Sequence, residues 1–431
     1  MDNSSWLARL FRIFPVAVLC VAWSASHSEA FHRGGVGNCS GCHSMHNGDS
    51  SPGKGNEGKF AILIASDPSS TCLSCHQKKG EVRTNGYLVS TSEENMPKGV
   101  PPAQLSPGGD FGWLKKSFRW IGEGGEASES QGERHGHNIV AADYRFVSDR
   151  SLVTSPGGTY PSASLTCISC HDPHGRYRRF ADGSIGTSGA PILASGSYDS
   201  SPDPTDTDAV GVYRLLRGKG HNTSHDPGES FTTDPPAAVA PMDYNRTEEG
   251  SDTHVAYGAG MSEWCANCHR DYLVGTHQGT GHPAGSSARL SPTIVSNYKA
   301  YISSGNLSGN PEGAYTSMVP YEMGEYDYSM LKKIAGGKET GNSAPGTKSN
   351  VMCLTCHRAH ASGWDRATRW NMKTGFLVYS GDYPGVEDPA VPSKVSQGRT
   401  RGETRRTFHE RSPSKYAIYQ RSLCNKCHAK D

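Results

Sequence analysis

The pattern Cys-x-x-Cys-His occurs six times in this 431-residue chain, and it restricts the fold more than any other feature. Such spacing is the attachment signature of c-type haem, whose porphyrin bonds to both thiols and whose iron binds the imidazole. A zinc ribbon needs two cysteine pairs per metal, and a thioredoxin-like pair needs no histidine. The cysteines are Cys39, Cys42, Cys72, Cys75, Cys167, Cys170, Cys265, Cys268, Cys353, Cys356, Cys424 and Cys427. The histidines are His43, His76, His171, His269, His357 and His428. We therefore predict six covalently bound haem c groups.

The composition indicates that haem replaces a conventional hydrophobic core. Only 34% of the residues are hydrophobic, whereas 51 Gly and 26 Pro favour turns. The first cysteines of successive motifs lie 33, 95, 98, 88 and 71 residues apart, so no repeat of fixed period is present. We predict a mostly irregular, loop-rich fold with short α-helices and few short strands, organised around a chain of six haems. A helix is expected over 295–303 and a strand over 61–65, and the haem-free chain should not fold.

Residues 1–30 have the pattern of a cleaved secretory signal. Two arginines precede an apolar run over 13–23, and a small-x-small cleavage site ends at Ala30. The run is too short to span a bilayer, and no later stretch is apolar enough to do so. A lipid anchor at Cys20 is the alternative, which the bulky residue before it disfavours. Residues 31–431 are expected to form a single hexahaem unit, secreted through the periplasm to the extracellular space or outer cell surface.

The charge balance argues against a nucleic-acid partner. The formal net charge is +1, and each haem would add two propionates. Arg176, Arg178 and Arg179 directly follow the third motif, and they could either pair with propionates or form a solvated basic stretch. A second set of arginines is expected to be solvated surface. These are Arg399, Arg401, Arg405, Arg406 and Arg411.

The second axial ligand of each iron decides between an electron carrier and an enzyme. Outside the motifs, residues 31–431 contain twelve histidines, twice the number that six irons need. Ligation by Met45, Met261 or Met352 is an alternative that would raise the potential. Six of the histidines carry no spacing argument and are expected to be exposed or hydrogen-bonded. These are His135, His221, His225, His254, His277 and His409.

Three motifs continue to a further histidine three residues on, at His46, His174 and His360. On a helical turn such a residue faces the same side as the motif histidine, so both cannot bind one iron from opposite faces. Each must then reach a different iron, which predicts closely packed haems. His32, His137 and His282 are the other candidate distal ligands.

The segments between the motifs resemble the hexahaem outer-surface cytochrome S family of metal-reducing bacteria, over essentially all of residues 31–431. The resemblance is carried by Pro107-Gly-Gly-Asp-Phe-Gly-Trp113, Gly136-His137-Asn138, His282-Pro283-Ala284-Gly285 and the residues around the third to sixth motifs. It implies distal ligands at His32, His46, His137, His174, His282 and His360. It also implies that His46 ligates a haem of a neighbouring subunit, since family members polymerise into conductive filaments.

Together these features predict an electron-transfer protein and not an enzyme. It would carry electrons along bis-histidine haems, polymerise head to tail into an extracellular filament, and exchange electrons with other redox proteins and external acceptors. A discrete soluble or cell-surface carrier is the alternative. A multihaem reductase is less favoured, because it needs an open iron and all six motifs keep their histidine.

Overall fold

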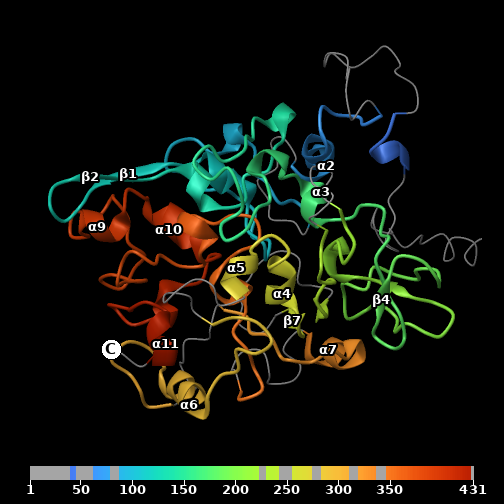
Figure 1. The fold of residues 1–431 in the computed structure, drawn as a ribbon. Coiled ribbons are helices and arrows are strands. Elements are labelled where there is room, and N and C mark those ends of the chain that lie inside the picture. The colour runs from blue at the N-terminus through green and yellow to red at the C-terminus, as the bar shows by residue number, and fades with distance from the viewer. Residues whose placement is uncertain are drawn as a thin grey trace, which may run out of the picture.

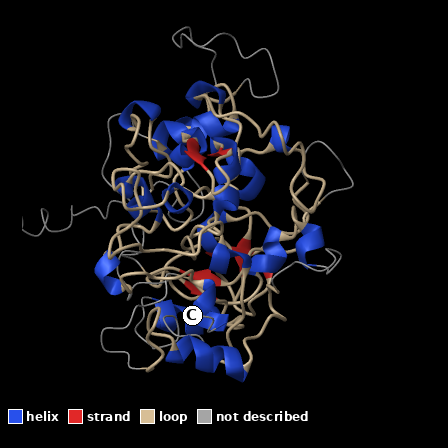
Figure 2. Ribbon diagram, turned by 90° about the vertical axis from the view of Figure 1, so that its left-hand side faces the viewer, coloured by secondary structure: helices blue, strands red, loops and turns tan. Residues whose placement is uncertain are grey.

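The computed structural model describes residues 39–44, 62–77, 87–222, 230–241, 255–273, 283–309, 319–335 and 346–428. Loops and turns form most of the described chain, and the helices and strands between them are short (Figures 1 and 2). The loop-rich fold expected from the composition is therefore confirmed.

The helices of the described residues are mostly one or two turns long. They are α2 (Pro68–His76), α3 (Cys167–Cys170), α4 (Met261–Cys265), α5 (Arg270–Leu273), α6 (Pro292–Ala300), α7 (Tyr328–Ile334), α8 (Cys353–Cys356), α9 (Ser393–Ser396), α10 (Arg401–Thr407) and α11 (Cys424–His428). Single 3-10 turns are η1 (Cys39–Gly41), η2 (Glu93–Asn95), η3 (Phe111–Lys115), η4 (Gly132–His135), η5 (Ala142–Tyr144), η6 (Ser162–Ser164), η7 (Tyr213–Leu215), η9 (Asp365–Ala367) and η10 (Pro413–Lys415).

The described strands form three small antiparallel sheets. They are β1 (Phe118–Ile121), β2 (Ala127–Ser130), β3 (Arg178–Arg179), β4 (Ile185–Gly186), β5 (Val210–Gly211), β6 (Ala238–Val239) and β7 (Ala256–Tyr257). Strand β1 pairs with β2 as a hairpin, β3 lies between β4 and β5, and β6 pairs with β7. None is wide enough to act as a layer, so the sheets join neighbouring loops and do not define the architecture.

Polar caps determine where the longer helices begin. Helix α6 starts at Pro292, three residues before the expected helix, because the Ser291 hydroxyl accepts the Ile294 N–H at 3.3 Å and proline is favourable in the first turn. The strand expected over 61–65 is not formed within its described part. There, Leu63 makes only an isolated bridge with His43.

Buried apolar side chains form several separate clusters and not one core. The largest surrounds Trp364, Trp370 and Tyr383 and joins α6 to the chain around the sixth motif. Others lie around Tyr257 beside α4 and around Leu331 in α7. Between the clusters runs a continuous cavity of about 2240 Å³, at least twice the volume of a typical small-molecule pocket. The chain thus surrounds a large internal space, as expected if bound groups replace part of the core.

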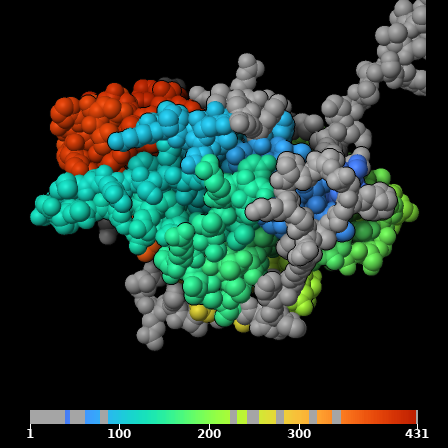
Figure 3. Space-filling model, turned by 90° about the horizontal axis from the view of Figure 1, so that it is seen from above, coloured from blue at the N-terminus to red at the C-terminus, as the bar shows by residue number. Residues whose placement is uncertain are grey.

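Segments far apart in sequence are joined at the edge of the molecule formed by β1, β2, α9 and α10 (Figures 1 and 3). Arg399 links them, although it was expected to be solvated. It is only 1% exposed, and its guanidinium lies 4.1 Å from the Phe118 ring centroid and 4.4 Å from that of Trp364. It donates to the Gly363 carbonyl at 2.9 Å. Arg411 is also buried, so the solvated assignment is wrong for both residues.

Replacing Arg399 by Met should lower the free energy of unfolding by about 3 kcal/mol, because buried acceptors lose a charged donor. Guanidinium unfolding of the haem-loaded protein, followed by circular dichroism, measures the change. Arg119→Met is the matched control, since the Arg119 side chain is 85% exposed. Equal midpoints for the two variants would show that Arg399 does not hold this edge together.

Candidate haem-binding site

Each motif folds into a single turn that brings its two thiols and its imidazole together. The backbone N–H of His171 donates to the carbonyl of Cys167 at 3.0 Å, and that of His357 donates to Cys353 at 3.0 Å. The first and fourth motifs make the same hydrogen bond, from His43 to Cys39 at 2.9 Å and from His269 to Cys265 at 3.0 Å. Within the described residues, no disulfide joins any of the twelve motif cysteines. The thiols are thus arranged for attachment to another group.

The histidines are oriented by hydrogen bonds from the ring atom Nδ1 to backbone carbonyls. Nδ1 lies 2.8 Å from the carbonyl oxygen of Arg214 in His171, of Pro156 in His269 and of Arg366 in His357. The corresponding distances are 2.5 Å from His76 to Tyr87 and 2.7 Å from His137 to Ala359. A carbonyl acceptor at Nδ1 leaves Nε2 available, which is the usual arrangement for a metal-ligating imidazole.

Three motif histidines face a second histidine from a distant part of the chain. The ring centroids of His43 and His174 are 6.2 Å apart, those of His269 and His137 are 6.0 Å apart, and those of His171 and His360 are 6.4 Å apart. The three partners, His137, His174 and His360, are all candidate distal ligands. The structure therefore places each of these candidates opposite the histidine of a Cys-x-x-Cys-His motif distant in sequence.

These separations fit one iron between each pair. A metal–imidazole bond is about 2 Å long, so two imidazoles on opposite sides of one metal have centroids roughly 6.4 Å apart. Burial lowers the pKa of His360 to about 3 and of His269 to about 4, with smaller contributions from the facing histidines His171 and His137. Neutral imidazole is the form that binds metal. The thiols of the second to sixth motifs line the 2240 Å³ cavity, so this region fits several covalently attached haems.

Successive motifs touch one another in sequence order. The Cys72 and Cys167 side chains hydrogen-bond, which raises the pKa of the first thiol and lowers that of the second. Cys265 and Cys353 do the same, with the pKa of Cys265 raised and that of Cys353 lowered to about 7. These thiol properties belong to the chain before haem attachment and here report proximity.

At the remaining three junctions, the second cysteine of one motif is influenced by a cysteine of the next. Burial raises the pKa of each of these thiols most, and the next largest contribution comes from the charge of Cys75 for Cys42, of Cys268 for Cys170 and of Cys424 for Cys356. At each of the five junctions, a thiol is thus influenced by a cysteine of the next motif along the chain. Figure 1 agrees, with α2 beside α3, α4 near the centre and α11 beyond it.

The comparisons with known proteins give a family. The chain is 48% identical over 427 residues to the C-type cytochrome OmcS of Geobacter sulfurreducens, and the match covers 96% of this chain and 98% of OmcS. The chain belongs to the OmcS family. It superposes with a TM-score of 0.83 and 47% identity on the cryo-EM structure of OmcS nanowires from that organism, covering 93% of this chain and 100% of that one. A second structure, the outer membrane cytochrome S filament, gives the same values. No protein-family model matches the chain.

The family resemblance read from the motifs is thus confirmed. Membership in this family of c-type cytochromes means that the chain carries covalently bound haem c. Among the described residues, no helix is both long and apolar enough to cross a membrane. The candidate distal ligands His32, His46 and His282 lie outside the described residues, as do the surplus histidines His225, His254 and His277.

The structure of this OmcS-family chain also contains an internal repeat that the motif spacing does not reveal. In the first, third and fifth motifs, the histidine forms an antiparallel bridge with a returning segment, as His43 with Leu63, His171 with Leu216 and His357 with Thr368. These are the three motifs that continue to a further histidine. The third and fifth motifs also make one equivalent contact each with the motif before them. The backbone N–H of Cys167 donates to the Ser69 hydroxyl, and that of Cys353 donates to the Ser262 hydroxyl, both at 3.0 Å.

The helical turn expected to carry the further histidines is not formed, although two of them lie opposite other motifs as expected. Helix α3 ends at Cys170 and α8 at Cys356, so the motif histidine and the one three residues later are not on a helix. After the turn the chain is extended, and His174 and His360 nevertheless face histidines of other motifs. In both motifs the returning segment pairs with the backbone of the motif histidine, at Leu216 for His171 and at Thr368 for His357. The chain beyond the motif histidine is thereby directed away from that histidine's own site.

One short backbone pairing positions two of the candidate distal ligands together. The N–H of His137 donates to the carbonyl of His360 at 2.9 Å, and Gly136 forms an antiparallel bridge with Ala361. A Cβ on Gly136 would lie 2.2 Å from the His360 carbonyl oxygen, so this approach requires glycine. The two imidazoles, which face the fourth and third motifs, are therefore held by one contact.

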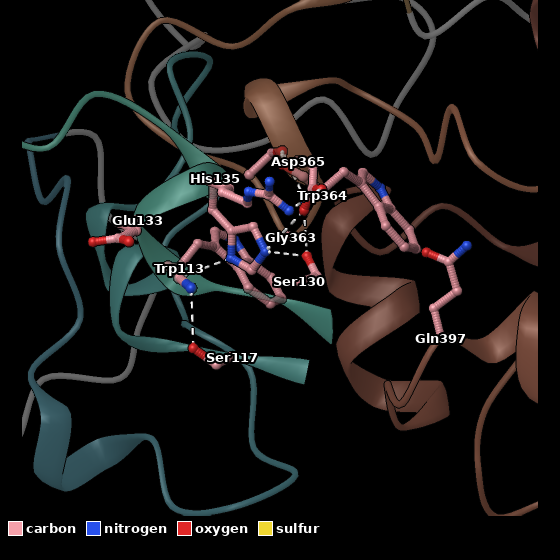
Figure 4. A network of polar contacts seen from close by, with 12 residues as sticks. Trp113, Ser117, Ser130, Glu133, His135, Gly363, Trp364, Asp365 and Gln397 are labelled. Atoms are coloured by element: carbon pink, nitrogen blue, oxygen red, sulfur yellow. Dashed lines mark hydrogen bonds and ion pairs between the residues drawn. The ribbon is translucent and has the colours of Figure 1, made fainter. Parts of the chain in front are cut away.

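The surplus histidine His135 continues this pairing, because its carbonyl accepts the N–H of Ser362 at 3.0 Å. Figure 4 shows the contacts of its ring. It is fully buried, with Nδ1 3.0 Å from the Trp113 carbonyl and Nε2 2.8 Å from the Ser130 hydroxyl, which also donates to Asp365. Burial, with Arg399 second, lowers the pKa of His135 to about 3, so the ring is neutral. His135 is hydrogen-bonded as expected and is two residues from His137. Its contacts with η9 place it next to the carbonyl that orients His357.

The arginines after the third motif have protein partners. Arg176 pairs with Asp172 at 3.2 Å, Arg178 donates to the Ala190 carbonyl at 2.8 Å, and Arg179 donates to that of Gly183 at 3.2 Å. Arg179 is buried, so the solvated alternative is wrong for this residue.

Replacing His360 by Ala should open one iron per chain. The facing ring of His171 would remain, so the affected haem should become high-spin and its ferrous form should bind carbon monoxide. Optical spectra with and without carbon monoxide measure both changes. His221→Ala is the control, because His221 accepts from Arg217 at 3.0 Å and faces no motif histidine among the described residues. Unchanged spectra in the His360 variant would exclude it as a ligand.

Proposed function

We propose that this protein carries electrons along six covalently bound haems and polymerises head to tail into an extracellular filament. The observation that carries the proposal is the set of three facing histidine pairs, together with the thiol contacts that join the second motif to the third and the fourth to the fifth. The nanowire structures of OmcS support it, since this chain matches them over their full length. The haems, when bound, supply reversible one-electron chemistry at iron.

The protein's own residues close the irons and hold them in order. We assign His174, His360 and His137 as distal ligands opposite His43, His171 and His269. The remaining candidates are His32, His46 and His282, for the irons of His76, His357 and His428. Two imidazoles on every iron leave no position for a substrate and favour low potentials over methionine ligation, which supports a carrier over a reductase.

The facing pairs also suggest which iron His46 ligates. The further histidine of the third motif faces the first motif, and that of the fifth motif faces the third. Each step goes back by two motifs. Continuing from the first motif, in a repeating series of six, leads to the fifth motif of the preceding subunit. We therefore assign His46 to the iron of His357 in the neighbouring chain.

The surroundings of His357 support this assignment. Within the described residues, the ring of His357 faces no second imidazole at the separation found in the three pairs, whereas its Nδ1 is fixed by the Arg366 carbonyl. Burial lowers the pKa of His357 most, the Arg366 carbonyl raises it, and the charge of His137 lowers it further. The ring of His137 faces His269, so His137 is not a partner for His357. A contact of this type is heterologous and need not close, so it would propagate as a helical filament.

Export and exchange partners complete the proposal. Residues 1–30 lie outside the described residues, so their cleavage as a secretory signal stays a prediction. We propose an extracellular or outer-surface location, in which other redox proteins load the filament and external acceptors discharge it. A discrete carrier at the cell surface is the alternative.

Replacing His46 by Ala should abolish filaments while leaving six covalent haems. The backbone and all twelve thiols are unchanged, so attachment should proceed, but the iron of His357 would lose its second ligand from the neighbour. Electron microscopy checks for filaments, and intact mass checks the haem count. His221→Ala, made in parallel, should still polymerise. Filaments of normal length in the His46 variant would refute its role.

A further inference from the structure

Two carboxylates, one buried and one half-buried, lie where the fourth and fifth motifs meet, outside the haem-binding residues. Glu322 is fully buried, and Glu263 is in α4, two residues before Cys265. Neither carboxylate forms an ion pair with a described Lys, Arg or His, and the salt bridges of the described residues lie elsewhere. Burial, followed by the charge of Glu263, raises the pKa of Glu322. When both carboxylates are ionised, no cationic side chain of the described residues balances their negative charge.

One residue, Ser286, holds three side chains around this point. Its N–H donates to Oε1 of Glu263 at 2.7 Å, and its hydroxyl donates to Oε1 of Glu322 at 3.1 Å. Its carbonyl accepts from Nδ2 of Asn350 at 3.3 Å. Glu322 and Asn350 also exchange both backbone hydrogen bonds, at 3.0 and 2.7 Å, so they are directly opposite residues with side chains on one face.

Each of these three side chains has one oxygen atom that is buried and has no hydrogen-bond partner. The atoms are Oε2 of Glu263, Oε2 of Glu322 and Oδ1 of Asn350. Asn350 is only 1% exposed. An unpaired buried polar atom costs about 1–3 kcal/mol, and more if it is charged. Three such atoms on neighbouring side chains indicate a shared ligand of positive charge.

We propose that Glu263, Glu322 and Asn350 bind one hard divalent cation, Ca²⁺ or Mg²⁺. Carboxylate and amide oxygens are the ligands these ions prefer, whereas transition metals favour nitrogen or sulfur. No set of three or more His, Cys, Asp or Glu side chains arranged for a metal occurs among the described residues, and here the amide of Asn350 takes the third place. Water would complete the coordination shell.

The cation would link two consecutive haem-attachment turns. Glu263 belongs to the turn of the fourth motif, and Asn350 lies three residues before Cys353 of the fifth. Ser262 already accepts a hydrogen bond from the N–H of Cys353 across the same junction. The ion would neutralise both carboxylates and hold this junction, near the middle of the chain of motifs (Figure 1), whether or not the protein polymerises.

Metal analysis of the haem-loaded full chain tests the proposal. After dialysis against metal-free buffer, mass spectrometry of the elements should find one Ca²⁺ or Mg²⁺ per chain in addition to haem iron, and it also distinguishes the two ions. Chelation by EDTA should lower the melting temperature by about 4 °C, and restoring the ion should reverse this. Glu263→Gln/Glu322→Gln should lose the ion and the response to EDTA. Glu126→Gln, at an exposed carboxylate, should keep both.

Two results would overturn the proposal. The first is wild-type protein without a stoichiometric divalent cation and without a response to EDTA, which would mean that the two carboxylates share a proton. The second is retention of the ion by the double variant, which would place it elsewhere. If the double variant yields no haem-loaded protein, the wild-type metal content and EDTA response still decide between the cation and the shared proton.

Discussion

Facing imidazoles from distant parts of the chain are the constraint on which the rest of this structure depends. His43 and His174 are 131 residues apart, His137 and His269 are 132 apart, and His171 and His360 are 189 apart. A metal bound between two such residues closes a long loop, as a disulfide would. With 34% hydrophobic residues and only separate apolar clusters among the described residues, we propose that the chain depends on such cross-links. The hydrogen bonds from Nδ1 to carbonyls make the imidazoles rigid enough to act in this way.

The same constraint accounts for the order of the motifs in space. The further histidine of the third motif faces the first motif, and that of the fifth motif faces the third. The second and fourth motifs are therefore held between the two motifs that each pair joins. The hydrogen bonds of Cys167 to Ser69 and of Cys353 to Ser262 then repeat the same even–odd contact. A repeated unit of this kind provides a path in which each site has a neighbour before and after it. The ends of the path, at the first and sixth motifs, are where another subunit can extend it.

Much of the chemistry could be predicted from the sequence, since the thiols and the proximal histidines are local motifs. The loop-rich fold followed from glycine, proline and the low apolar content. The pairings could not be predicted, because they depend on returning segments such as the one at Leu216, whose sequence has no distinctive pattern. The buried role of Arg399 was missed because a basic run looks like surface, and its aromatic partners Phe118 and Trp364 come from separate segments. The pairing of Glu322 with Asn350 could not be predicted either, because neither residue belongs to a motif and the two come from separate segments.

The central claim is that every iron is closed by two imidazoles, which makes the protein a conductor. Electron paramagnetic resonance of the oxidised assembled protein tests this most directly, because it separates low-spin bis-imidazole iron from high-spin iron with an open position. We expect low-spin signals that account for all six haems and no high-spin signal. A stoichiometric high-spin haem in the assembled wild-type protein would contradict the account and point to a substrate-binding site.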